Sequence, residues 1–160
     1  MTEEDQLHHE PDRPAVGRIV AVDYGTVRIG IAISDVGRRW ASPHENYTRR
    51  GKDQDVRYFR KLVSDEQVTL FVVGLPVFNS GDESPKSREA REFGAWLGEI
   101  TGVPVEYYDE RYTSAQAEEM LLAADLTKKR RKKRLDMVAA QIILASYLER
   151  GTGESHRWSI

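Results

Sequence analysis

The chain has 160 residues, of which 39% are hydrophobic and 31% charged, and its formal net charge is −2 at pH 7. These values are typical of a single soluble globular domain. The absence of cysteine excludes disulfides and thiolate metal sites. No apolar run is long enough to cross a bilayer, so we expect a cytoplasmic protein with no membrane partner. Because the net charge is small, any binding of nucleic acid has to depend on a local basic patch.

The two ends of the chain differ in composition from the middle. Residues 1–16 are rich in Asp and Glu and contain Pro11 and Pro14, which predicts a flexible acidic arm. Residues 151–160 follow Gly151 and are expected to form a loose tail. The sequence therefore predicts one folded domain over residues 17–150.

Two apolar runs, residues 19–22 and 29–33, are separated by a short polar turn that contains Gly25. Their composition and spacing predict an antiparallel β-hairpin. Asp23 ends the first run, and alternation along a strand puts it on the same face as Ile19 and Ala21. Residues 40–48 form a plausible third strand with a weak pattern.

The rest of the domain alternates between strand and helix patterns. Ser84 and Pro85 are a typical N-cap and first helical residue, and Thr113 with Gln116 forms a capping box. The patterns predict strands over residues 68–73 and 103–108, and helices over residues 55–65, 85–101, 113–122 and 135–149. The last helix is apolar on nearly every side and is expected to be buried. This order predicts an α/β fold with a mixed five-stranded sheet flanked by helices on both faces.

Carboxylates occur at three places where they could bind a metal ion or take part in catalysis. Asp23 ends the first strand, Asp109 and Glu110 end the last strand, and Asp136 opens the last helix. Functional groups gather at the carboxyl ends of parallel strands. Clustered carboxylates repel one another unless a cation neutralises them, and oxygen-only ligands favour Mg²⁺ or Mn²⁺. Such ions activate water in phosphodiester hydrolysis, so the set suggests a metal-dependent nuclease with Asp23, Glu110 and Asp136 as its metal ligands.

Each carboxylate also has a simpler structural explanation. Asp23 could form the hairpin turn, and Glu110 could pair with Arg111 or another surface cation. Asp136 could be a first-turn residue whose negative charge is stabilised by the helix dipole. The pattern alone does not decide between these explanations for any single residue. The placement of the three together favours a common site.

Candidate phosphate-binding residues lie close to these carboxylates in the sequence. Arg28 and Arg111 could hold phosphate oxygens, although structural pairing with neighbouring acids explains them equally well. A run of basic residues directly precedes Asp136 and is either a solvated segment or a nucleic-acid contact. The run comprises Lys128, Lys129, Arg130, Arg131, Lys132, Lys133 and Arg134. Trp40, Trp96 and the tyrosines are expected in the core or at its rim.

Four motifs in this order, VDYGTVRIGIAISD, VVGLP, DERYTS and LDMVAAQIILASYLE, resemble the YqgF family of ribonuclease H-like proteins. That family is described as pre-16S rRNA nucleases and Holliday-junction resolvase homologues. The resemblance covers residues 17–150 and implies a ribonuclease H-like fold. It also implies a metal site made by Asp23, Glu110 and Asp136, with Arg28 and Arg111 as motif arginines. Residues 77–81 depart from the family pattern, which puts any substrate contact of that loop in doubt.

The function expected from the resemblance is cleavage of structured RNA, most specifically maturation of the 5′ end of pre-16S rRNA with Mg²⁺ or Mn²⁺. Cleavage of branched DNA is the alternative within the same class, and a resolvase would be expected to act as a dimer. A non-catalytic RNA- or ribosome-binding factor and an ATPase-like nucleotide-binding domain are alternatives from other classes. We expect a monomer or a weak homodimer.

Overall fold

The computed structural model describes residues 17–113, 115, 119 and 137–150. Several predicted features lie outside the described residues: the acidic arm (1–16), most of the helix over 113–122, the basic run (128–134), Asp136 and the tail (151–160). For these features the sequence-based statements stay predictions.

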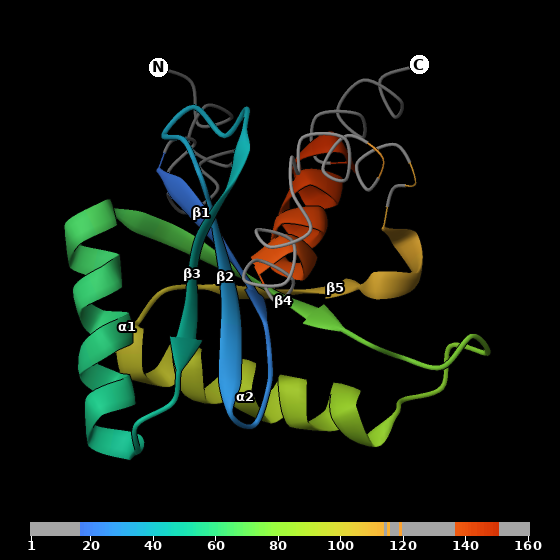
Figure 1. Ribbon diagram of the computed structural model, residues 1–160, viewed down its shortest axis with the longest axis horizontal. Coiled ribbons are helices and arrows are strands. Elements are labelled where there is room, and N and C mark those ends of the chain that lie inside the picture. The colour runs from blue at the N-terminus through green and yellow to red at the C-terminus, as the bar shows by residue number, and fades with distance from the viewer. Residues whose placement is uncertain (1–16, 114, 116–118, 120–136, 151–160) are drawn as a thin grey trace, which may run out of the picture.

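A single five-stranded sheet in the order β3-β2-β1-β4-β5 forms the centre of the described fold (Figure 1). The strands are β1 (Arg18–Asp23), β2 (Arg28–Ser34), β3 (Ala41–Thr48), β4 (Val68–Leu75) and β5 (Val105–Asp109). β1 pairs antiparallel with β2 and β2 antiparallel with β3, whereas β4 is parallel to both β1 and β5. The predicted hairpin, third strand and mixed five-stranded sheet are therefore confirmed.

The sheet separates two hydrophobic clusters, as alternation along β1 illustrates. Val20 and Val22 belong to the cluster under α1 (Lys52–Glu66) and α2 (Pro85–Thr101). Ile19 and Ala21 point the other way and pack with the helix formed by residues 137–150. Figure 1 shows α2 below the sheet and this C-terminal helix above it. Helices thus cover both faces, as the element order predicted.

The sequence pattern predicted the ends of α2 correctly but not the start of α1. Ser84 caps α2 by accepting a hydrogen bond from the backbone N–H of Ser87 at 3.0 Å, and Gly102 ends the helix, both as predicted. The predicted start of α1 at residue 55 was wrong, because the helix begins at Lys52 after Gly51, whose φ is 102°. The first turn is polar and exposed, so it carries no apolar signal.

The C-terminal helix buries one face most deeply. Its buried apolar residues are Ala140, Ile143, Leu144 and Leu148. Val138 and Ile142 are half-buried, and within residues 137–148 no residue is exposed, in agreement with the prediction of a buried helix. No helix in the described ranges is both long and apolar enough to cross a membrane.

Candidate active site

Asp23 and Glu110 lie at the same edge of the sheet. Asp23 is the last residue of β1, and Glu110 opens the short 3₁₀ helix η2 (Glu110–Tyr112) directly after β5. β4 lies between these two strands and is parallel to both, so all three strands end on one side. By alternation, Asp23 continues the face of Ile19 and Ala21, which packs against the C-terminal helix. The fold therefore brings together two of the three predicted metal ligands.

Gly74 of β4 provides the space in which the Glu110 carboxylate lies. A Cβ at position 74 would stand 3.0 Å from Glu110 Oε1 and 2.5 Å from Ile143 Cδ1. A side chain at position 74 would therefore force the ends of the Ile143 and Glu110 side chains to move. The carboxylate and Ile143 of the C-terminal helix consequently share the surface above Gly74.

The electrostatics of Glu110 reflect this placement. Burial is the main cause that raises the pKa of Glu110 to about 7, and the negative charges of Asp23 and Asp109 raise it further. The positive charge of Lys86 acts in the opposite direction. A nearby cation stabilises the ionised form of a carboxyl group that is partly buried beside another carboxylate. Asp23 and Glu110 together offer only oxygen donors, so they fit a hard divalent ion such as Mg²⁺ or Mn²⁺.

The third predicted ligand, Asp136, directly precedes the first described residue of the C-terminal helix, Met137, and lies outside the described residues. Within the described ranges, no three His, Asp or Glu side chains are grouped so that they could hold a metal ion. In the described part of the chain, the candidate metal site therefore consists of two carboxylates, Asp23 and Glu110.

Arg111 is held by its neighbours on the outer side of η2. Its Nη2 and Nε donate to Asp109 Oδ2 and Oδ1 at 2.7 and 3.1 Å, and its Nη1 donates to the carbonyl of Asn79 at 3.2 Å. The hydrogen bonds from Arg111 hold the pKa of Asp109 below its usual value. The pairing partner of Arg111 is thus Asp109 rather than Glu110, and Arg111 ties the end of β5 to the loop after β4.

The other predicted phosphate ligands are less constrained. Arg28 is exposed at the start of β2, beside the turn that follows Asp23. Because β2 is antiparallel to β1, Arg28 lies toward the same sheet edge as Asp23. The basic run from Lys128 to Arg134 lies outside the described residues.

Two residues near the site were not singled out from the sequence. Gly74 interrupts an apolar strand, where glycine is unusual and marks a close approach, so that signal was present in the VVGLP motif. Lys86 lies in the first turn of α2 and is brought near Glu110 only by the tertiary fold, for which the sequence gives no signal.

Comparison with known proteins agrees with this geometry. A family model described as "RuvX: Holliday junction resolvase" matches residues 17–150. A protein of Rhodopirellula baltica named "Putative pre-16S rRNA nuclease" is 46% identical over 136 residues, covering 85% of this chain and 79% of the relative. A protein of Syntrophomonas wolfei with the same name is 42% identical over 135 residues, covering 84% and 96%.

Among solved structures, Thermus thermophilus RuvC bound to a Holliday junction superposes with a TM-score of 0.60 at 15% identity, covering 86% of this chain and 96% of RuvC. The yeast mitochondrial Holliday junction resolvase Ydc2 gives a TM-score of 0.54 at 11% identity, covering 98% and 89%. At such identities these structures support the ribonuclease H-like fold alone. The family match and the sequence relatives show that the chain belongs to the RuvX family, which is the family that its motifs resemble under the name YqgF.

Proposed function

We propose that this protein is a divalent-metal-dependent nuclease that matures the 5′ end of pre-16S rRNA in the cytoplasm. The names of its relatives support the substrate. The single observation that carries the chemistry is the pair Asp23 and Glu110, two carboxylates at the carboxyl ends of β1 and β5 that influence each other's charge at one sheet edge beside Gly74. Pairing with Arg111 does not explain Glu110, because Arg111 is engaged by Asp109.

Asp23, Glu110 and, as predicted, Asp136 would hold Mg²⁺ or Mn²⁺. When bound, such an ion makes water a better nucleophile and stabilises the charge that develops on the leaving oxygen. Glu110 has to lose its proton before it can act as a ligand, which couples the site to pH near neutrality. Gly74 leaves room for the Glu110 carboxylate and for the side chain of Ile143.

Binding of the RNA backbone requires positive charge close to the carboxylate pair. Arg28 and Lys86 supply such charge in the described part of the chain. The run from Lys128 to Arg134 would add to it, since it directly precedes Asp136 in the sequence. Binding through these groups predicts affinity that falls steeply as salt rises.

Cleavage of branched DNA is the second candidate function, and the description of the family model favours it. A resolvase has to cut two strands symmetrically and would act as a dimer. The two functions therefore differ in substrate and in the oligomeric state of the active species.

The test is cleavage of a pre-16S rRNA 5′ fragment and of a four-way DNA junction, each with Mn²⁺, with Mg²⁺ and with chelator. Asp23→Asn and Asp136→Asn are compared with the parent, and Asp65→Asn on the exposed side of α1 is the matched control. We expect metal-dependent RNA cleavage that both site substitutions abolish. Junction cleavage instead would support the resolvase function. RNA binding without cleavage of either substrate would contradict a nuclease and indicate a binding factor.

A further inference from the structure

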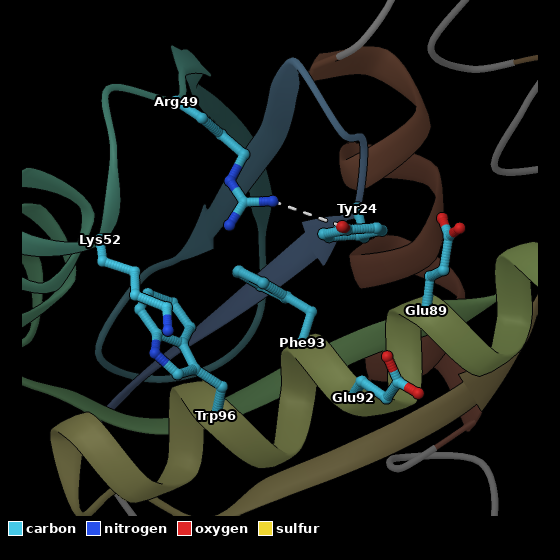
Figure 2. Close-up of a pocket in the computed structure, with 7 residues that line it drawn as sticks. All are labelled: Tyr24, Arg49, Lys52, Glu89, Glu92, Phe93 and Trp96. Atoms are coloured by element: carbon cyan, nitrogen blue, oxygen red, sulfur yellow. Dashed lines mark hydrogen bonds between the residues drawn. The ribbon is translucent and has the colours of Figure 1, made fainter.

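A second concave region lies on the opposite face of the sheet from Ile143, next to the turn that follows Asp23. It is a pocket of about 200 Å³ lined by Tyr24, Arg49, Lys52, Glu89, Glu92, Phe93 and Trp96 (Figure 2). The volume is below that of pockets for drug-sized ligands, so it suits a small planar group. None of these side chains belongs to the proposed metal site or to its proposed phosphate-binding residues.

The floor of the pocket is aromatic. The rings of Tyr24 and Phe93 lie 5.0 Å apart, and those of Phe93 and Trp96 lie 5.4 Å apart. Phe93 is buried, whereas Tyr24 and Trp96 are half-buried and pack at the rim of the core. The guanidinium of Arg49 lies over the rings of Tyr24 and Phe93, so the half-buried ring of Trp96 is the one best suited to stacking on a planar ligand.

Arg49 is fixed in place above this floor. Its Nε lies 3.3 Å from Oδ2 of Asp55, whose side chain is only 2% exposed, and its Nη1 donates to the Tyr24 hydroxyl at 3.3 Å. The guanidinium carbon lies 5.7 Å from the centre of the Tyr24 ring and 5.8 Å from that of Phe93. Asp55 is itself held by Tyr47 at 2.6 Å, so the arginine is positioned by a buried anchor before any ligand arrives.

The polar rim carries charges of both signs. Arg49 and Lys52 are donors, and Figure 2 shows Glu89 and Glu92 on the α2 side of the same pocket. The carboxylates of Glu89 and Glu92 would repel a phosphate group, and the charges of Arg49 and Lys52 would repel a purely cationic ligand. The rim instead matches a planar group that presents hydrogen-bond acceptors on one edge and donors on another. Guanine has this pattern, with O6 and N7 as acceptors and amino and imino hydrogens as donors.

We propose that this pocket receives one unstacked guanine base of the substrate strand. Trp96 would stack on the base, Arg49 and Lys52 would donate to its acceptors, and Glu89 or Glu92 would accept from its N–H groups. Tyr24 directly follows Asp23 in the chain, so a strand that reaches the metal site can turn around the sheet edge into the pocket. This inference rests on the proposed function, because it assumes a nucleic-acid strand at Asp23.

The test uses the full chain with Asp23→Asn and chelator, so that no cleavage can occur. Phe replaces Trp40 and Trp158, which leaves Trp96 as the only one of the 3 tryptophans. The RNA pentamers UUGUU and UUUUU are titrated, and quenching of Trp96 fluorescence is recorded. We expect UUGUU to bind roughly tenfold more tightly, because the carboxylate contacts require guanine donors. We also expect it to bind more tightly than free GMP, since its phosphates reach the basic groups near Asp23.

Glu89→Gln and Glu92→Gln are compared with Glu99→Gln, an exposed glutamate further along α2 that does not line the pocket. At least one of the first two should reduce the preference for UUGUU several-fold, whereas Glu99→Gln should leave it unchanged. Equal affinity for both pentamers, or a preference that survives both pocket substitutions, would overturn the proposal. GMP binding as tight as UUGUU would overturn the assignment to a strand. A guanine preference in a chain that cleaves no RNA would leave the pocket assigned and contradict only the nuclease proposal.

Discussion

The carboxylate of Glu110 lies directly above Gly74, with Oε1 3.0 Å from where a Cβ of residue 74 would stand. β4 lies between β1, which ends at Asp23, and β5, which Glu110 directly follows. A side chain at position 74 would therefore displace Glu110 at the sheet edge where the charge of Asp23 acts on it. The first prediction tests this relationship.

Replacing Gly74 by Ala should displace both Glu110 and Ile143, since the new methyl group would lie 2.5 Å from Ile143 Cδ1. We expect a loss of about 1–3 kcal/mol in the free energy of unfolding, as for overpacked cores, together with loss of cleavage. Urea unfolding and RNA cleavage measure the two effects. The matched control is Gly98→Ala in α2, where the new Cβ would lie 3.2 Å from Val105 Cγ2 and helix propensity favours Ala by about 1 kcal/mol, so the tight contact and the propensity oppose each other and cleavage should not change. Unchanged activity in Gly74→Ala would contradict the proposed placement of Glu110.

The raised pKa of Glu110 predicts a pH dependence of stability in metal-free protein. Its folded-state pKa of about 7 exceeds the ordinary value of 4.5, so folding favours the protonated form. This contribution is complete below pH 4.5 and is lost as the pH rises to about 7. Glu110→Gln cannot lose a proton and should therefore gain stability relative to the parent over this interval, by about 2 kcal/mol after solvent screening.

The measurement is thermal unfolding of the parent and Glu110→Gln in chelator across this pH range. Glu99→Gln, an exposed substitution on α2, serves as the control and should show no such divergence. A constant difference between the parent and Glu110→Gln would show that the pKa of Glu110 is not raised.

The forked pairing of Arg111 with Asp109 predicts a measurable coupling between the two residues. Lys cannot form the planar two-point contact, and Asn carries no charge, so either substitution alone should remove most of the interaction. A double-mutant cycle with Asp109→Asn and Arg111→Lys should give a coupling of about 1 kcal/mol, because both side chains are partly exposed. Additive effects of the two substitutions would instead show that the fork contributes nothing to stability.

Asp55 should be among the most sensitive positions outside the active site. It is buried and accepts hydrogen bonds from the Tyr47 hydroxyl at 2.6 Å and the Arg50 backbone N–H at 2.9 Å. Asp55→Ala would leave these donors and Arg49 without their partner, at a cost of about 3 kcal/mol in the free energy of unfolding. Tyr47→Phe removes only one bond and should cost about 1 kcal/mol. Equal costs in urea unfolding would contradict the role of Asp55 as a shared acceptor.

Much of the fold was predictable from the sequence because local patterns determine it. The apolar runs over residues 19–22 and 68–73 predict strands, and Ser84 with Pro85 predicts the start of α2. The start of α1 was missed because its first turn is polar. The C-terminal helix was expected to be buried from its apolar composition, but that composition does not determine which of its residues contact the sheet.

The site was only partly predictable. Asp23 and Glu110 stood out because each ends a strand, which places it at the sheet edge whatever the details of packing. The contact of Glu110 with Gly74 depends on how η2 and the C-terminal helix meet β4, and no local pattern encodes that. The pocket around Arg49 likewise combines residues that follow β1 and β3 with residues of α1 and α2, which only the tertiary fold brings together.

The central claim is that Asp23 and Glu110 hold a divalent cation. The most direct test is Mn²⁺ binding, followed by electron paramagnetic resonance of free Mn²⁺ at a pH above the pKa of Glu110, for the parent, Asp23→Asn and the exposed control Asp65→Asn. We predict that Asp23→Asn weakens Mn²⁺ binding roughly tenfold or more, while Asp65→Asn leaves it unchanged. Equal Mn²⁺ affinity in the parent and Asp23→Asn would contradict the proposed metal site.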